Sequence, residues 1–149
     1  MDVTSGTQFA RLLLGAFEVM VAEVRVSLEE AGHPGLTVAN ELAMQAIDHG
    51  ASSAASLARE TGVSRQAAAK TISMLESLGY VIRDSDPADA RKKHLRVTAE
   101  GRAAVDVGAA AFNRIYERWQ RENGPDSRVA IAAIEELMRL GQSIENRTR

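Results

Sequence analysis

Residues 57–67 have the sequence Leu-Ala-Arg-Glu-Thr-Gly-Val-Ser-Arg-Gln-Ala, which predicts two short helices joined by a tight turn. Gly62 ends the first helix, over residues 54–61, because glycine readily adopts the left-handed backbone that closes a helix. Ser64 caps the second helix, over residues 65–78, because a serine oxygen accepts a hydrogen bond from an N–H group of the first turn. Two helices joined in this way are typical of a helix-turn-helix.

A β-hairpin is predicted directly after the second helix. Gly79 ends that helix, and residues 80–83 and 95–97 have the composition and alternation of two short strands. The polar residues between them, 84–91, form the tip of the hairpin. A helix-turn-helix followed by such a hairpin is a winged helix, which we expect over residues 37–98.

Longer amphipathic helices flank this unit. Apolar residues recur at three- and four-residue steps over residues 7–31, 99–122 and 128–146. A further short helix, over residues 38–48, precedes the helix-turn-helix. The expected N-terminal caps are Thr37 for the helix over 38–48 and Thr98 for the helix over 99–122. The cap of the helix over 128–146 is either Asp126 or Ser127. The order of four helices, two strands and two helices predicts a mainly α (α+β) fold.

Composition excludes several classes of protein. The chain has 149 residues, of which 45% are hydrophobic, which is enough to fill the core of one domain. It has no cysteine, so disulfides, thiol catalysis and cysteine-based metal or redox sites are excluded. No apolar stretch approaches the roughly 20 residues that span a bilayer, and the N-terminal segment lacks the basic region of a signal peptide. We therefore expect a cytoplasmic protein without a membrane partner.

The net charge of −2 conceals a basic segment in the middle of the chain. Residues 57–96 contain eight basic and five acidic side chains, a net charge of +3. Residues 1–56 have a net charge of −5, and residues 97–149 have a net charge of 0. Because the basic segment coincides with the predicted winged helix, the charge pattern favours a nucleic-acid partner.

A recognition helix enters the major groove of DNA with its first residues at the edges of the bases. Arginine pairs with guanine, glutamine pairs with adenine, and alanine can contact the methyl group of thymine. Serine hydroxyls and helix N-termini suit phosphates, and cations at a hairpin tip suit the minor groove or the backbone. The candidate DNA-binding residues are Ser53, Ser64, Arg65, Gln66, Ala67, Lys70, Arg91, Lys92 and Lys93.

The sequence resembles the MarR family of bacterial transcription regulators over nearly the whole chain. The resemblance is strongest in residues 57–67 and in residues 75–83, Leu-Glu-Ser-Leu-Gly-Tyr-Val-Ile-Arg. It is most specific in the hairpin, where Asp-Pro-Ala-Asp-Ala-Arg at 86–91 precedes Leu-Arg-Val-Thr-Ala-Glu-Gly at 95–101. Val97 stands where the family usually has leucine, which is a small departure.

The resemblance implies a single MarR-like domain over residues 1–149 that forms a homodimer and binds a pseudo-palindromic operator as a ligand-responsive repressor. The helices over 7–31 and 99–146 would form a dimerisation lobe, and residues 37–98 would contact double-stranded DNA. The resemblance also implies that Arg91 enters the minor groove and that Asp89 orients it through a salt bridge. Asp89 therefore joins the candidate DNA-binding residues.

The same resemblance implies a small aromatic or phenolic effector, bound between the dimerisation lobe and the winged helix. The candidate pocket residues are Phe17, Met44, Phe112 and Tyr116. Apolar residues at helical spacing are also typical of a protein core or a dimer interface, so both interpretations stay open for these four.

Other function classes have less support. The overall acidity favours, as an alternative, a helical dimer that binds a small molecule or a protein without binding DNA. Catalysis is disfavoured because the GxSxG, P-loop, GxGxxG and HExxH motifs are absent. The three histidines, His33, His49 and His94, lack the spacing of metal ligands, so no metal or cofactor is expected.

Overall fold

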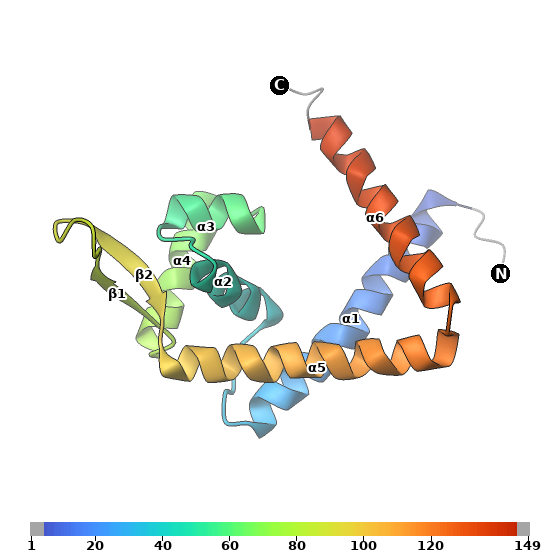
Figure 1. The fold of residues 1–149 in the computed structure, drawn as a ribbon, viewed down its shortest axis with the longest axis horizontal. Helices are drawn as coiled ribbons and strands as arrows, with labels where there is room; N and C mark the ends of the chain where they lie inside the picture. Colours follow the sequence, from blue (N-terminus) through green and yellow to red (C-terminus); the bar gives the residue numbers. More distant parts are fainter. Residues whose placement is uncertain (1–4, 146–149) are drawn as a thin grey trace. The chain divides into compact units, whose positions relative to one another are not determined.

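The computed structural model describes residues 5–145 of the chain, and Figure 1 shows their fold. Its elements in chain order are α1 (Gly6–Glu30), α2 (Val38–Asp48), α3 (Ala54–Thr61), α4 (Arg65–Ser77), β1 (Val81–Ser85), β2 (Lys93–Val97), α5 (Ala99–Asn123) and α6 (Asp126–Glu145). Most described residues are helical, and one antiparallel hairpin forms the sheet. The predicted mainly α (α+β) winged-helix fold is therefore confirmed.

The described residues fall into two compact units. The first extends to Phe112 and contains the winged helix, and the second begins at Asn113, so α5 contributes to both. A single MarR-like domain over residues 1–149 stays a prediction.

Hydroxyl side chains begin the central helices as predicted. The side-chain oxygens of Thr37, Ser53 and Ser64 accept hydrogen bonds of 3.1–3.2 Å from backbone N–H groups in the first turns of α2, α3 and α4. The Thr98 hydroxyl accepts the N–H of Gly101 at 3.1 Å and begins α5 in the same way. Gly79 follows α4 with φ +80°, the left-handed conformation predicted for the end of that helix.

The start of α6 differs from the prediction. The helix begins at Asp126 rather than at residue 128, and neither predicted cap is correct. Ser127 lies inside the helix, and its hydroxyl donates to the carbonyl oxygen of Gly124 at 2.7 Å. The earlier start is explained by Pro125, whose fixed φ suits entry into a helix and which has no N–H to satisfy.

Other boundaries shift by a few residues. The strands are longer towards the tip than predicted, because the ladder also pairs Asp84 with His94 and Ser85 with Lys93. The first strand begins at Val81 rather than at residue 80. Helices α1 and α4 each end one residue earlier than predicted, and α5 ends one residue later.

The core of the first unit lies where α2, α3, α4 and the hairpin meet. Its fully buried side chains include Met44, Leu57, Ile72, Leu75 and Val97. Helices α1 and α5 add the buried residues Val24, Leu28, Ala104 and Ala111 to the same cluster. The core therefore holds the helix-turn-helix and the hairpin as one body.

Helices α1 and α6 keep large apolar side chains on the surface. The exposed residues on α1 are Phe9, Leu12, Leu14, Phe17, Val19 and Val26, and those on α6 are Val129, Ile134, Leu137, Met138 and Leu140. Apolar surface gathered in this way is typical of a protein–protein contact. None of the described helices is long and apolar enough to cross a membrane.

Candidate nucleic-acid interface

The first turn of α4 presents the predicted DNA-contacting side chains to solvent. Ser64, Arg65, Gln66, Ala67 and Lys70 are all exposed. The opposite face of the helix packs into the core through Ala68, Ile72 and Leu75, which are buried. In the described part of the chain, the side chains of Arg65, Gln66 and Lys70 have no hydrogen bond or ion pair, so they are available to a ligand.

The N-terminus of α3 is closed by two serines. The Ser53 N–H donates to the Ser56 hydroxyl oxygen at 2.9 Å, and the Ser56 N–H donates to the Ser53 oxygen at 3.2 Å. This reciprocal arrangement is a capping box. Because the Ser53 hydroxyl already serves the cap, its contact with a phosphate stays a prediction.

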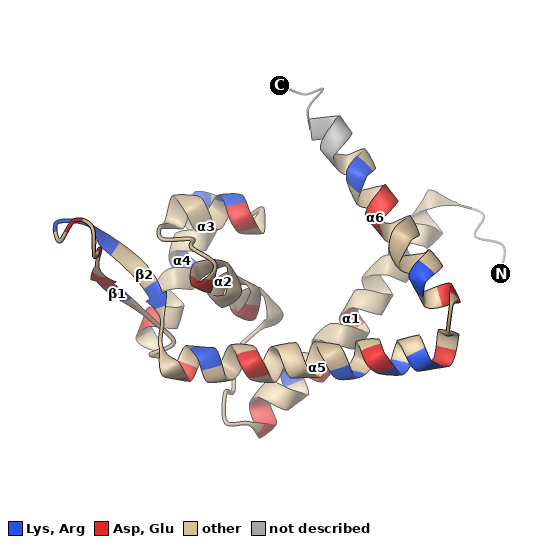
Figure 2. Ribbon diagram, viewed as in Figure 1, with Lys and Arg blue, Asp and Glu red and all other residues tan. Residues whose placement is uncertain are grey.

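Aspartates shape the tip of the hairpin, residues 86–92. The Asp86 carboxylate accepts the N–H of Ala88 at 2.8 Å, and the Asp89 carboxylate accepts the N–H of Arg91 at 3.1 Å. Each bond forms an Asx turn, in which an aspartate side chain bonds the backbone two residues later. The side chains of Arg91 and Lys92 are exposed at this tip, and Figure 2 shows cations and acids together there.

The ion pair expected between the side chains of Asp89 and Arg91 is not present among the described residues. The Asp89 carboxylate is instead engaged by the backbone N–H of Arg91. The turn uses one oxygen of the carboxylate, and the Arg91 guanidinium has no ion-pair partner among the described residues. Whether Asp89 also orients Arg91 on DNA stays a prediction.

Two ion pairs hold the hairpin in place. Their arginines, Arg83 and Arg96, are not among the predicted DNA-binding residues. The Arg83 Nε donates to Glu76 of α4 at 2.9 Å, and Arg96 lies 3.2 Å from Asp84 across the strands. The hydrogen bond from the Ser85 N–H lowers the pKa of Asp84 most, and the hydrogen bond from Arg96 lowers it further. Lys93 Nζ donates to the Ser85 hydroxyl at 3.3 Å, so this lysine is already engaged within the hairpin.

The comparison with protein families decides the class of this winged helix. A family model described as MarR family matches residues 34–92, from the turn before α2 to the tip of the hairpin. Over these residues the winged helix is similar to the MarR family. Comparison with curated protein sequences gave no match.

Solved structures of MarR-type proteins share the fold of nearly the whole chain. BpsR of Bordetella bronchiseptica is 24% identical over 93% of this chain and 95% of its own, with a TM-score of 0.65. The Mycobacterium tuberculosis MarR family protein RV2887 is 26% identical over 86% and 96%, with a TM-score of 0.61. FabT of Streptococcus pneumoniae is 17% identical over 95% and 99%, with a TM-score of 0.71.

These structures contain or concern different ligands. The BpsR structure concerns regulation of DNA binding by 6-hydroxynicotinic acid. RV2887 was solved with p-aminosalicylic acid, and FabT was solved in complex with DNA.

The four candidate pocket residues occupy different environments in this chain. Met44 is fully buried in the core, and Phe112 packs against that core with part of its surface exposed. Phe17 is 48% exposed on α1. Tyr116 belongs to the second unit, where its ring lies 6.3 Å from the ring of Trp119. A shared pocket for these residues stays a prediction.

Two buried polar groups of the MarR-type fold were missed by the sequence analysis. Glu41 is fully buried on α2, in helical phase with the buried residues Val38 and Met44, and this phase was a usable signal. His33 is 5% exposed, and its Nδ1 lies 3.1 Å from the Tyr80 hydroxyl oxygen. Burial raises the pKa of Tyr80, and the negative charge of Glu100 raises it further by a smaller amount.

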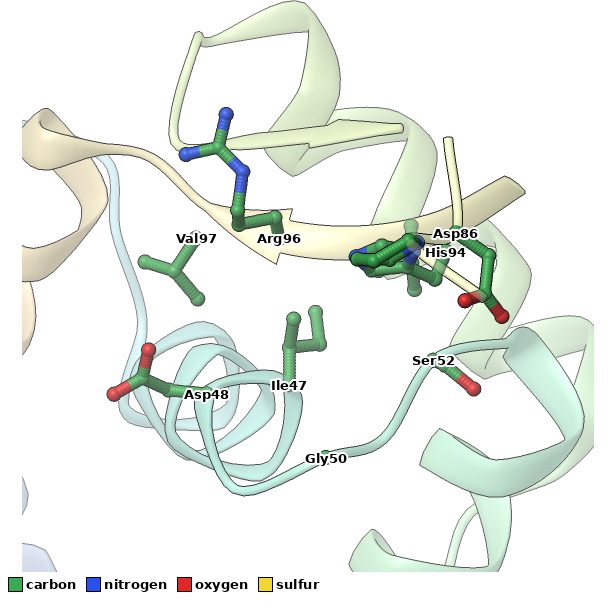
Figure 3. A pocket seen from close by; sticks show the side chains of 10 residues that line it. Ile47, Asp48, Gly50, Ser52, Asp86, His94, Arg96 and Val97 are labelled. Carbon is green, nitrogen blue, oxygen red and sulfur yellow. The ribbon is translucent and has the colours of Figure 1, made fainter. Parts of the chain in front are cut away.

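A pocket lies between the end of α2 and the wing (Figure 3). Its volume is about 370 Å³, and it is lined by Ile47, Asp48, Gly50, Ser52, Asp86, Pro87, His94, Leu95, Arg96 and Val97. The described residues contain no group of three or more histidine, aspartate or glutamate side chains placed to hold a metal ion.

Proposed function

We propose that this protein is a sequence-specific regulator of transcription that binds double-stranded DNA as a homodimer. The observation that carries this proposal is the position of four exposed cations without ion-pair partners among the described residues. They are Arg65 and Lys70 on α4 and Arg91 and Lys92 at the wing tip. All four lie on the winged helix, and the rest of the chain is acidic or neutral.

Each cation has a distinct role in the proposed complex. Helix α4 enters the major groove, where Arg65 pairs with a guanine and Gln66 pairs with an adenine. Ser64, Ala67 and Lys70 adjoin these contacts, and Ser53 lies at the N-terminus of α3, which suits a phosphate. The wing reaches the neighbouring minor groove, into which Arg91 inserts while Lys92 and Lys93 contact the backbone.

The homodimer follows from the outer helices. Helix α1 and helix α6 each keep exposed apolar side chains, which a second copy of the chain would cover. A two-fold dimer presents two copies of α4, so the operator is a pseudo-palindrome. Its half-sites are one helical turn apart, which is about 10 base pairs.

We also propose that a small aromatic or phenolic effector regulates DNA binding by this protein. It is supported by the ligands of BpsR and RV2887, which share the fold and bind hydroxylated or amino-substituted aromatic acids. The candidate residues here are Phe17, Met44, Phe112 and Tyr116. We propose that the protein acts as a repressor, which requires an operator placed so that the bound protein blocks the promoter until the effector releases it.

The experiment is a selection of bound fragments from the sheared genome of the source organism. The wild type is expected to enrich one pseudo-palindrome. Arg91→Ala is expected to bind the enriched sequence about tenfold more weakly, which corresponds to about 1.4 kcal/mol. Arg128→Ala is the matched control, because Arg128 is an exposed arginine of α6 outside the winged helix. Equal loss in both variants would show that overall charge, not the wing, determines binding.

The alternative is a helical dimer that binds a small molecule or a protein without binding DNA. It is favoured by the net charge of −5 over residues 1–56. Protein that has been refolded without ligand separates the two functions. If it shows neither an enriched sequence nor salt-dependent binding to DNA, the alternative replaces the proposal.

A further inference from the structure

The pocket between α2 and the wing has an apolar floor and a polar rim. Ile47 at the end of α2 and Leu95 and Val97 of β2 are each no more than 4% exposed. Asp86 and His94 border the pocket from the wing, and both side chains are partly buried. The volume of about 370 Å³ lies within the range of roughly 300–1,000 Å³ that is typical of small-molecule sites.

One negative charge at this rim has no cationic partner. Asp48 is paired with Arg102 at 3.0 Å, and Arg96 is paired with Asp84 at 3.2 Å. Figure 3 shows the Arg96 side chain pointing away from Ile47. The Asp86 carboxylate accepts the N–H of Ala88 and, within residues 5–145, no cation. The pocket therefore favours a positively charged guest.

The register of the hairpin brings a second polar group to the same place. His94 lies directly opposite Asp84, and Asp86 comes just after the last paired residue of β1, so both residues line the pocket near the tip of the hairpin. Because both residues line one pocket, a small group inside it can bond both side chains. The His94 ring has no hydrogen bond among the described residues, and a neutral imidazole offers one acceptor nitrogen.

We propose that this pocket binds a small organic cation, a primary amine with a short apolar or aromatic body. The ammonium group donates hydrogen bonds to the Asp86 carboxylate and to the acceptor nitrogen of His94. The apolar body covers Ile47 and Val97. Carboxylates and phosphates of similar size are excluded, because they would approach the unpaired charge of Asp86.

Such a guest would join two parts of the winged helix. The backbone already connects them through the Leu95 N–H, which donates to the Ser52 carbonyl at 3.3 Å. A bound amine adds a contact between the end of α2 and the base of the wing. Any effect on DNA binding rests on the proposed function, whereas binding of the amine itself does not.

The test uses the full chain without DNA, and its probe is benzylamine. The titration is made at pH 8, where an alkylamine is charged. Titration is followed by the backbone amide signals of Gly50, Ser52 and His94 in nuclear magnetic resonance spectra. Benzylamine is expected to shift these signals saturably, and benzyl alcohol and benzoate, which have the same ring, are expected not to do so.

Two matched variants locate the site. Asp86→Asn keeps the Asx turn, since an asparagine oxygen accepts the same N–H, and it is expected to weaken benzylamine binding at least fivefold. Asp89→Asn makes the same change in the other turn of the tip, outside the pocket, and is expected to leave amine binding unchanged. Equal binding of benzyl alcohol, no saturation, or equal affinity of the wild type and Asp86→Asn would overturn the proposal. None of these outcomes depends on whether the protein binds DNA.

Discussion

The carboxylate of Glu41, on α2, occupies the space that a side chain at Gly108, on α5, would need. A Cβ atom at Gly108 would lie 2.5 Å from the Glu41 carboxyl carbon and 2.7 and 2.8 Å from its two oxygens. Glu41 is 0% exposed, and its Oε1 accepts a hydrogen bond from Gln45 at 2.7 Å. Its Oε2 has no partner among the described residues. The absence of a side chain at Gly108 on α5 therefore leaves the space that the buried Glu41 carboxyl group on α2 occupies.

Gly108→Ala is expected to destabilise the protein by about 1–3 kcal/mol, because the added methyl group overpacks a buried contact. This loss would outweigh the roughly 1 kcal/mol by which alanine is the better helix former. Urea unfolding measures the change. Gly15→Ala on α1 is the control, because no atom lies within 4 Å of a Cβ at that position, and it is expected to stabilise. A Gly108→Ala variant as stable as Gly15→Ala would contradict the close contact.

The stability of the wild type is expected to depend on the protonation of Glu41. Burial raises the pKa of this carboxyl group above its ordinary value of 4.5, and the Gln45 hydrogen bond opposes that shift more weakly. Because the folded state binds the proton more tightly, the stabilisation is complete below about pH 4.5. It is lost as the pH rises through the raised pKa. Glu41→Gln removes this titration and keeps the shape.

The measurement is the urea midpoint of the wild type and of Glu41→Gln between about pH 4 and pH 8. The difference between the two curves removes the contribution of every other titrating group. The midpoint of the wild type is expected to fall relative to that of Glu41→Gln as the pH rises. Parallel curves would show that the Glu41 carboxyl group titrates alike in the folded and unfolded chain.

Replacing Lys92 is expected to weaken binding to all DNA sequences alike. A phosphate contact releases counterions, so its loss reduces the slope of log affinity against log salt by about one unit. The slope is measured by titrating labelled DNA at several salt concentrations. Arg128→Ala provides the reference for an exposed cation of α6. If Lys92→Ala keeps the wild-type slope, Lys92 does not contact a phosphate.

Unlike Lys92→Ala, the variants Arg65→Ala and Gln66→Ala are expected to change which DNA sequence the protein prefers. Each should cost about 1–3 kcal/mol on the preferred operator and relax the base preference at one defined position. Affinities for the operator and for its single-base variants measure this effect. A uniform loss over all bases would assign the side chain to the DNA backbone instead of a base edge.

The helix-turn-helix and the hairpin were predictable because their signals are local. Ser53, Ser64 and Gly62 each act on a backbone group within four residues of themselves. The strand ends were less well predicted, because pairing partners such as Asp84 and His94 are not apolar and are ten residues apart. The start of α6 was misplaced because Pro125 supplies the helix entry that a side-chain cap was expected to supply.

The contacts that sequence reasoning missed are distant in the chain. Glu41 meets Gly108, and His33 meets Tyr80, through folding of the whole first unit. The amphipathic phase of α2 marked Glu41 as buried, but no local pattern indicated that its neighbour is a glycine. In the wing, sequence reasoning also missed the Asx turn in which the Asp89 carboxylate accepts the backbone N–H of Arg91.

An asparagine at position 89 would hold the same turn without a charge. The aspartate instead places a negative charge beside Arg91 and Lys92, on the surface that we propose meets DNA phosphates. Affinity for unmatched DNA depends mainly on charge, whereas a matched site adds contacts to the bases. The acid is therefore expected to shorten the time spent at unmatched positions more than the residence on the operator. On the proposed interface, we therefore expect this carboxylate to speed the search for the operator.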